Sequence, residues 1–362
     1  MDKQHFRKDL KEILCGTVLL EGIPEKEMLE KLRPLRNHID SHLPSRLFRY
    51  RSCSELNIDA FNEDKFYAVT PDKFNDPYDS LIRYDKEKLR EQALLCTKKE
   101  YIVSLRNYFQ SNGDFPKVLH TILPQELLDN FKTNLLNVDD EAIDAIESNM
   151  EPVREFLCNS IDKQTDEAVK SVKQMACIAC FSETIRSVTM WSHYADSHKG
   201  FALEYDMSTF RLKCQFCDKM KHCNQAAVCN IYPVVYDGKR YDATDFLAWF
   251  IVKGMGIPML NPDTFAASKC LLFKSPQWSY EREWRLVVSR LNDLQNKTPV
   301  CISNIRPKAI YYGMDISSVN KKLLHMIAKE KGIAEYQMGI EAKSFNYSMK
   351  IEKLRGKPAV KK

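Results

Sequence analysis

A long helical stretch in the middle of the chain limits the possible folds more than any other sequence feature. From about Asp85 to Met175 the sequence is rich in Leu, Glu, Lys and Asp, with apolar residues recurring about every 3.6 positions. Asn112-Gly113 and Pro124 interrupt this pattern, so several helices are expected. Strand-like alternation flanks the stretch, at residues 46–51 and 66–70 before it and 176–181 after it. The pattern therefore predicts a helical insertion within a strand-containing core.

The rest of the chain alternates between strand and helix patterns. Helices are expected within residues 1–40 and at 317–331, and further strands at 200–205, 231–236, 284–289, 309–312, 334–341 and 345–353. The fold class expected is α+β, with a core of small mixed or antiparallel sheets. The predicted organisation is a helical lead-in at 1–44, a core at 45–315 and a closing C-terminal part at 316–362 with a basic tail. The core includes the insertion at 85–175 and a cysteine-rich loop at 207–230.

Composition excludes some classes of protein. The chain has 362 residues, of which 44% are hydrophobic, which is enough for a substantial core. Its net charge is +5, from 54 basic and 49 acidic residues, so a nucleic-acid partner is permitted but not implied. No stretch approaches the roughly 18 apolar residues of a membrane helix, and no signal core follows Met1. We expect a soluble, cytoplasmic protein without a membrane partner; the sequence does not indicate its oligomeric state.

Twelve cysteines raise the question of disulfides or metal. Eight of them are scattered among apolar neighbours, as buried thiols usually are, which favours a reducing compartment: Cys15, Cys53, Cys96, Cys158, Cys177, Cys180, Cys270 and Cys301. The other four, Cys214, Cys217, Cys223 and Cys229, lie close enough for a closed, structural zinc site. The alternative is free cysteines in a variable loop, because the second pair lacks the usual spacing.

The densest functional pattern is the segment 190–201, Met-Trp-Ser-His-Tyr-Ala-Asp-Ser-His-Lys-Gly-Phe. It combines an indole, imidazoles, a phenol and an ammonium group within twelve positions. We interpret His193 as a catalytic candidate and Trp191, Tyr194 and Lys199 as ligand-binding candidates. The alternative is a turn of helix with Trp191 and Tyr194 in the core, His193 merely hydrogen-bonded and a glycine cap after it.

A second pattern lies at the entry to a predicted strand, where Glu281 and Glu283 are two residues apart. This spacing on a strand puts both carboxylates on one face, with Arg282 facing away. One carboxylate could then bind a ribose hydroxyl while the other stabilises an electron-poor sugar carbon. Arg285 follows as a ligand-binding candidate. The alternative is a solvated face with weak surface ion pairs.

Three further segments supply polar candidates. Arg49 and Arg51 are two residues apart on a predicted strand, so both can face one side, with Tyr50 on the other, and either could hold phosphate with a planar guanidinium. Ser182 places a hydroxyl at the end of another predicted strand. The turn Phe74-Asn75-Asp76-Pro77-Tyr78-Asp79 offers an amide and two carboxylates, at Asn75, Asp76 and Asp79. Its alternative is a structural corner held by side-chain to backbone hydrogen bonds. The sequence contains no Gly-rich phosphate loop, HExxH or GxSxG motif.

Taken in order, these motifs resemble the prokaryotic family of unknown function DUF2971. The resemblance covers about residues 45–315 and rests on five segments: Leu47 to Arg51, Phe74 to Asp79, Cys180 to Glu183, Met190 to Phe201 and Trp278 to Arg285. It implies where the fold and the site lie more than which reaction occurs. The cysteine-rich stretch is not part of this motif set.

A fainter pattern is similar to ADP-ribosyltransferases of the arginine, serine, glutamate type. Arg49 or Arg51, then Ser182, then Glu281-Arg282-Glu283 occur in the family's order, although the insertion widens the spacing and Ser182-Glu183 replaces Ser-Thr-Ser. The resemblance implies that arginine holds the NAD pyrophosphate and serine orders the nicotinamide ribose. Glu283 would stabilise the oxocarbenium-like centre as nicotinamide leaves.

The leading hypothesis is a bacterial NAD-using transferase or glycohydrolase, with a role resembling a toxin or phage-defence effector. Its acceptor would be a protein or a nucleic acid. The first alternative is a non-catalytic module that binds nucleic acid or a nucleotide. The second is a metal-dependent nuclease using Asp76, Asp79, Glu281 and Glu283 around magnesium.

Overall fold

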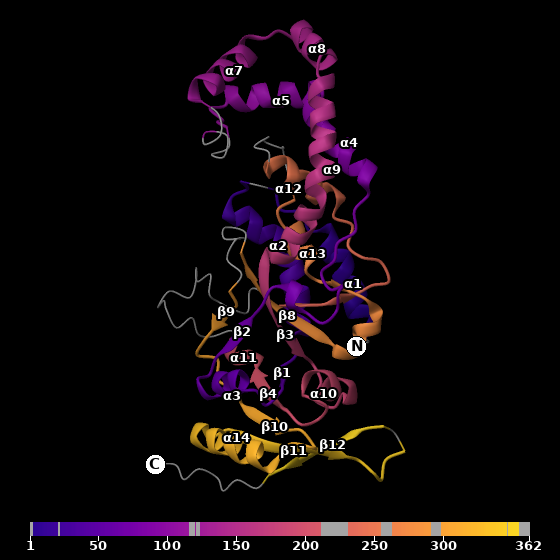
Figure 1. Ribbon diagram of the computed structural model, residues 1–362, viewed down its shortest axis with the longest axis vertical. Coiled ribbons are helices and arrows are strands. Elements are labelled where there is room, and N and C mark those ends of the chain that lie inside the picture. The colour runs from indigo at the N-terminus through magenta and orange to yellow at the C-terminus, as the bar shows by residue number, and fades with distance from the viewer. Residues whose placement is uncertain are drawn as a thin grey trace.

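The computed structural model describes residues 3–20, 22–115, 120, 124–210, 231–254, 263–290, 298–345 and 347–354. The molecule is elongated, with a sheet at its centre, a helical arm at one end and the C-terminal strands with helix α14 at the other (Figure 1). Mixed helix and sheet confirm the expected α+β class.

One large mixed sheet organises the described residues. Its strand order is β12-β11-β10-β4-β1-β3-β8-β5, and neighbours are antiparallel except the parallel pair β10–β11. The strands of this sheet are β1 (Arg46–Arg51), β3 (Ala176–Ser182), β4 (Phe201–Asp206), β5 (Ile231–Pro233), β8 (Glu283–Ser289), β10 (Ala309–Tyr312), β11 (Ala334–Ile340) and β12 (Met349–Lys353). Two smaller ribbons pair β2 (Phe66–Ala68) with β9 (Val300–Ile302), and β6 (Val235–Tyr236) with β7 (Phe273–Lys274).

The large sheet is nearly divided between β1 and β3. These two strands are registered at one position, Phe48 opposite Ser182, whereas β1 pairs with β4 along its whole length and β3 does so with β8. Beyond Phe48 these two strands no longer pair, and β3 pairs with Val69 at Ile178 instead. The candidate site lies beside Phe48 and Ser182.

Helices cover the sheet and extend it. The lead-in helices are α1 (Lys3–Gly16) and α2 (Glu25–His42). The central insertion contains α4 (Lys86–Leu94), η2 (Leu95–Thr97), α5 (Lys99–Gln110), α7 (Gln125–Asn137), α8 (Asp140–Ser148) and α9 (Glu151–Gln174). Asp85 and Asp139 cap α4 and α8 by accepting bonds from backbone N–H groups. Helices α5, α7 and α8 form the end of the arm, and α9 returns the chain to β3 (Figure 1).

The remaining elements include several that the sequence analysis did not predict. They are α3 (Glu55–Asn62), η1 (Pro71–Lys73), α11 (Met207–Phe210), α12 (Thr244–Gly254), α13 (Ala266–Cys270) and η4 (Pro276–Glu281). Helix α10 (Val188–Tyr194) is the turn of helix that was offered as the alternative for residues 190–201. The helix expected at 317–331 is α14 (Ser318–Lys331). The strands expected at 66–70 and 345–353 are shorter than predicted. Helix α12 was missed because its apolar residues lie on all sides, so it shows no amphipathic period.

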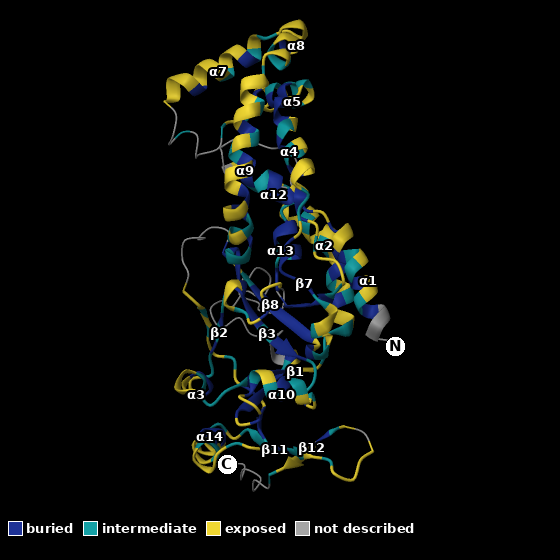
Figure 2. Ribbon diagram, turned by 45° about the vertical axis from the view of Figure 1, so that its right-hand side comes forward, coloured by how far each residue is buried: buried dark blue, intermediate teal, exposed yellow. Residues whose placement is uncertain are grey.

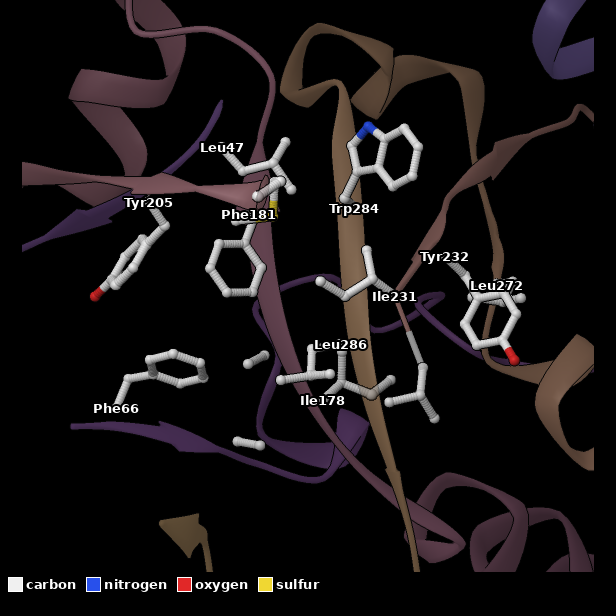
Figure 3. Close-up of a cluster of buried hydrophobic side chains, with 14 of the residues drawn as sticks. Leu47, Phe66, Ile178, Phe181, Tyr205, Ile231, Tyr232, Leu272, Trp284 and Leu286 are labelled. Atoms are coloured by element: carbon white, nitrogen blue, oxygen red, sulfur yellow. The ribbon is translucent and has the colours of Figure 1, made fainter. Parts of the chain in front are cut away.

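The two faces of the sheet carry different side chains. On one face Leu47, Phe181 and Trp284 join the main core, which α1 and α2 cover (Figure 3). On the other face lie Phe48 and Ser182, and α10 packs there against β1. Figure 2 shows most of β8 buried at the centre, while much of the arm is exposed. The first face therefore contributes to the main hydrophobic core, and the polar side chains of the candidate site lie on the second face.

The eight cysteines expected to be buried thiols are all free, but their burial differs. Cys96, Cys177 and Cys270 are buried, as expected. Cys15 and Cys301 are exposed, which contradicts the expectation for these two. Both lie at positions where the chain pattern is apolar but no neighbouring element covers the thiol.

Candidate functional site

A buried lysine is the centre of the polar cluster on the second face. The Nζ of Lys274, at the end of β7, lies 2.6 Å from Glu281 Oε2 and 3.2 Å from Glu283 Oε2. It is also 3.3 Å from Asp79 Oδ2. The sequence analysis did not single out Lys274. The available signal was its position at the end of the apolar run Cys270 to Phe273, where strand pairing draws a lysine inward.

Arg285 binds two of the same carboxylates. Its Nε donates to Glu283 Oε1 at 2.9 Å, and its Nη2 donates to Asp79 Oδ2 at 2.6 Å. Its Nη1 donates to the carbonyl oxygen of Leu271 at 2.6 Å. The side chain is 0% exposed, so it cannot meet a ligand as the sequence analysis expected. Arg285 instead fixes the two carboxylates, because a planar guanidinium can bond both at once.

The two glutamates converge, but not by the predicted strand alternation. Glu281 ends the 3-10 helix η4, whose Ser275 cap accepts a bond from Gln277 N, and β8 begins at Glu283. Between them Arg282 has φ 47°, in the left-handed region that non-glycine residues seldom adopt. This turn brings both carboxylates to Lys274. The prediction that the two carboxylates lie together was correct, but the predicted cause, side-chain alternation along a strand, was wrong.

The cluster gives the two carboxyl groups different acidities. Burial, together with the charge of Glu283, raises the pKa of Glu281 to about 7. Burial alone would also raise the pKa of Glu283, but the charges of Arg285 and Lys274 outweigh it and hold that pKa well below its usual range. One carboxyl is therefore a permanent anion and its neighbour can exchange a proton near neutral pH. Such a separation is the usual basis for assigning acid and base roles.

A cavity of about 100 Å³ opens beside the cluster. Its polar lining comes from all five of the predicted segments: Arg51, Asn75, Asp79, Ser182, Tyr194, Glu281 and Glu283, with Lys274. The Tyr194 hydroxyl donates to Glu281 Oε1 at 2.5 Å and lies 3.3 Å from Asn75 Nδ2. Ser182 Oγ donates to the carbonyl oxygen of Glu281 at 2.6 Å. The structure thus brings residues far apart in sequence to one small polar cavity, here called the small cavity.

The two arginines of β1 have different surroundings. Arg51 lines the small cavity, its Nη1 donates to the carbonyl oxygen of Tyr50 at 3.0 Å, and no carboxylate pairs with it among the described residues. Arg49 is buried, with its guanidinium stacked 4.3 Å from the ring centroid of Phe66 and 5.1 Å from that of Phe181. It does not line the small cavity. The structure therefore places Arg51, and not Arg49, at the small cavity.

Helix α10 also places its candidates differently than expected. Trp191 is 0% exposed and donates its Nε1 hydrogen to the carbonyl oxygen of Ile185 at 2.8 Å, so it cannot stack on a ligand. His193 is exposed outside the cavity, with Nδ1 2.9 Å from the Tyr280 hydroxyl. Lys199 is exposed and does not line the cavity either. Tyr194 alone among these four candidates reaches it.

The Asn75 to Asp79 turn is both a corner and part of the site. Asp76 Oδ1 accepts a bond from Tyr78 N at 2.9 Å, which is the structural role offered as the alternative. Asp79, 1% exposed, bonds Arg285 and Lys274. Asp76 lines a different, larger cavity. The turn therefore separates two cavities.

Metal sites were predicted in two places. Cys214, Cys217, Cys223 and Cys229 lie outside the described residues. Within the part that the structure describes, no group of three or more His, Cys, Asp or Glu side chains has a metal-binding arrangement. Of the four carboxylates of the nuclease hypothesis, Asp79, Glu281 and Glu283 surround Lys274 Nζ, which fills the place between them. Asp76 lines the other cavity.

The fold and the site together define an α+β protein with a buried lysine–carboxylate cluster at a split in its sheet. The sequence model of a family described as "Protein of unknown function (DUF2971)" matches residues 190–286. This match confirms the resemblance over a segment that runs from α10 through β8 and includes Tyr194, Lys274 and both glutamates. No curated protein and no solved structure matches the chain. A search of the described helices found none long and apolar enough to cross a membrane.

Proposed function

We propose that this protein uses NAD and breaks the glycosidic bond to nicotinamide, as an ADP-ribosyltransferase or a glycohydrolase does. One observation carries the proposal: Arg51, Ser182 and Glu283 lie on three successive strands, β1, β3 and β8, and line one cavity. Their order across the sheet is the order in which the arginine, serine, glutamate pattern occurs along the chain. If the three residues occurred in this order along the chain only by chance, we would not expect them to line the same cavity.

The charges around the small cavity suit this chemistry. Arg51 is without a carboxylate partner among the described residues and can hold a phosphate of the dinucleotide. Glu283 supplies a fixed negative charge where the sugar carbon becomes electron-poor. The Ser182 hydroxyl donates its hydrogen bond to the carbonyl oxygen of Glu281. Ser182 therefore positions Glu281 as well as lining the cavity.

The reaction balances with the residues present. The bond between ribose C1′ and the nicotinamide nitrogen breaks, and nicotinamide leaves with the bonding electron pair as a neutral molecule. The acceptor, water or a nucleophilic group of another molecule, forms the new bond to C1′ and loses a proton. Glu281 can take that proton, because its pKa of about 7 leaves it partly ionised at neutral pH. A toxin or phage-defence role in a bacterium would follow if the acceptor were a cellular protein or nucleic acid.

The first test measures nicotinamide release from NAD by the whole chain and by Glu283→Gln. We expect turnover in the parent protein and a loss of about 100-fold or more in the variant, as when an electrostatic stabiliser of a transition state is removed. Glu330→Gln, an exposed glutamate on α14, is the matched control and should keep full activity. Circular dichroism and thermal melting establish that each variant is folded.

The same experiment separates the alternatives. Salt-sensitive binding of NAD or of a nucleic acid, with no nicotinamide released even when lysate supplies acceptors, would favour the non-catalytic module. Magnesium-dependent cleavage of nucleic acid that survives Lys274→Met would favour the nuclease. Full NAD turnover by a folded Glu283→Gln protein would remove Glu283 from the mechanism.

A further inference from the structure

A second cavity, of about 360 Å³, adjoins the small cavity at Lys274, which lines both. We call it the large cavity. Its walls come from three segments: residues 76–81, residues 237–241 and the β7–η4 segment at 270–278. Its volume is in the range of small-molecule sites and exceeds that of the small cavity. The large cavity is the place where a second ligand group could lie next to the reacting cluster.

One buried carboxylate oxygen in its wall lacks a hydrogen-bond donor. Asp76 is 4% exposed and lines the large cavity. Its Oδ1 accepts the bond from Tyr78 N, but its Oδ2 has no partner among the residues that the structure describes. A buried carboxylate oxygen without a donor is costly, and such groups in native proteins are usually met by a ligand or an ordered water. A ligand with a hydroxyl or amino group in the cavity would donate the missing hydrogen bond to Asp76 Oδ2.

The charged groups of the wall divide into paired and unpaired ones. Asp237 forms an ion pair with Lys11, and Lys274 is held by the three carboxylates of the cluster. Lys239 and Arg240 are exposed, and neither pairs with a carboxylate in the described ranges. Two cations without a carboxylate partner and one carboxylate oxygen without a donor therefore face the cavity, although Arg240 Nη1 donates to the carbonyl oxygen of Ile82 at 3.5 Å. This combination suits a ligand with both a phosphate and a hydroxyl or amino group.

An aromatic ring completes the wall. Trp278 lines the large cavity, is partly exposed, and has its ring centroid 4.9 Å from Lys274 Nζ and 6.0 Å from the ring centroid of Tyr280. A partly exposed indole offers a face on which a nucleobase can stack.

We propose that the large cavity binds a nucleoside monophosphate unit. Its phosphate lies beside Lys239 and Arg240, its base lies on Trp278, and a hydroxyl or amino group donates to Asp76 Oδ2. This inference rests on the proposed use of a nucleotide, but not on the reaction. The unit is either the adenylate half of the dinucleotide or part of a nucleotide acceptor, placed across Lys274 from the small cavity.

The test uses AMP as the probe and isothermal titration calorimetry on the whole chain. Lys239→Ala and Arg240→Ala change exposed side chains, so both variants should fold, and each should weaken AMP binding by roughly tenfold. Lys350→Ala, an exposed lysine on β12, is the matched control and should bind AMP as the parent does. Equal AMP affinity in all four proteins, or no binding at millimolar AMP, would overturn the proposal.

Kinetics with NAD then identifies the source of the unit. If it is the adenylate half of NAD, AMP competes with NAD and raises KM without changing kcat. If it belongs to an acceptor, AMP leaves the KM for NAD unchanged and becomes covalently modified, which mass spectrometry detects. Site-dependent AMP binding by a parent protein that releases no nicotinamide would refute the proposed function and leave this inference standing. Nicotinamide release without AMP binding would do the opposite.

Discussion

At the scale of single residues, Lys274 decides whether three buried carboxylates can coexist. Its ammonium group lies within 3.3 Å of Asp79, Glu281 and Glu283, and its side chain is 4% exposed. The same charges raise the pKa of Lys274 above its usual value despite burial, which alone would lower it. Burying such a cluster stabilises the fold only while every charge keeps its partner.

We expect Lys274→Met to lower the free energy of unfolding by about 3 kcal/mol or more, because it leaves buried carboxylates without their shared cation. Urea denaturation monitored by tryptophan fluorescence measures the change. Lys350→Met is the matched control, since Lys350 is exposed, and should change stability little. A loss below about 0.5 kcal/mol would show that the cluster is not held by Lys274.

The raised pKa of Glu281 predicts a pH dependence of stability. A carboxyl whose pKa rises from its usual 4.5 to about 7 on folding binds its proton more tightly in the native state. Its contribution to stability is fully present below pH 4.5 and is lost as the pH rises through about 7. Replacing this group by glutamine, in Glu281→Gln, should remove that fall. Melting temperatures measured from pH 4.5 to pH 8 for both proteins test it, and identical profiles would contradict the assignment.

The same residue predicts how activity responds to pH. If Glu281 accepts the proton of the attacking group, nicotinamide release should rise with pH to half its maximum near pH 7. Glu281→Gln should be inactive across the range. Retained activity with an unchanged profile in the variant would transfer the base role to another group.

At the scale of elements, the junction of η4 and β8 places the two glutamates. Arg282 is exposed and left-handed, so its side chain contributes little while its backbone conformation sets the geometry. Glycine adopts this conformation freely, and β-branched residues resist it. Substitutions at Arg282 can therefore test the effect of the backbone conformation separately from that of the side chain.

We expect Arg282→Gly to keep both stability and NAD turnover close to those of the parent protein. Arg282→Val should cost about 1–2 kcal/mol of stability and lower turnover by at least tenfold, because strain at this residue moves Glu281 relative to Glu283. Thermal melting and nicotinamide release measure the two effects. Equal behaviour of the two variants would show that the left-handed turn does not position the carboxylates.

At the scale of the whole molecule, the end of the helical arm is separate from the site, whereas α9 reaches the Asn75 to Asp79 turn, where Lys173 Nζ donates to the carbonyl oxygen of Pro77 at 3.0 Å. The end of the arm has its own small core, with Ile102, Leu105, Phe109, Leu135 and Ile143. The arm begins and ends side by side, because Thr97 Oγ1 accepts a bond from Arg154 Nε at 3.2 Å. Neither cavity has a lining residue from it.

Replacing residues 99–150 with a short Gly-Ser linker should therefore leave a folded protein with unchanged nicotinamide release from free NAD. The linker joins points that are already close, so the entropy cost of loop closure is small. Size-exclusion chromatography, melting and the NAD assay check the outcome. Lost modification of an acceptor with intact NAD cleavage would instead assign the arm to acceptor binding.

Local sequence patterns were sufficient to predict much of the secondary structure of this protein and several of its candidate site residues. Alternation and 3.6-residue periodicity identified most strands and helices, and the sequence motifs supplied Ser182, Tyr194, Glu281 and Glu283 as candidates, which line one cavity in the structure. These features are readable because side-chain direction follows from local backbone geometry.

Only the tertiary structure decided which of the polar residues meet in one place. It placed Trp191 and Arg285 out of a ligand's reach, separated Arg49 from Arg51, and brought Lys274 to the centre. The physical reason is that burial and pairing depend on strands distant in the sequence. The partners of Lys274 come from residue 79 and from residues 281 and 283, and no local pattern specifies the distance between them.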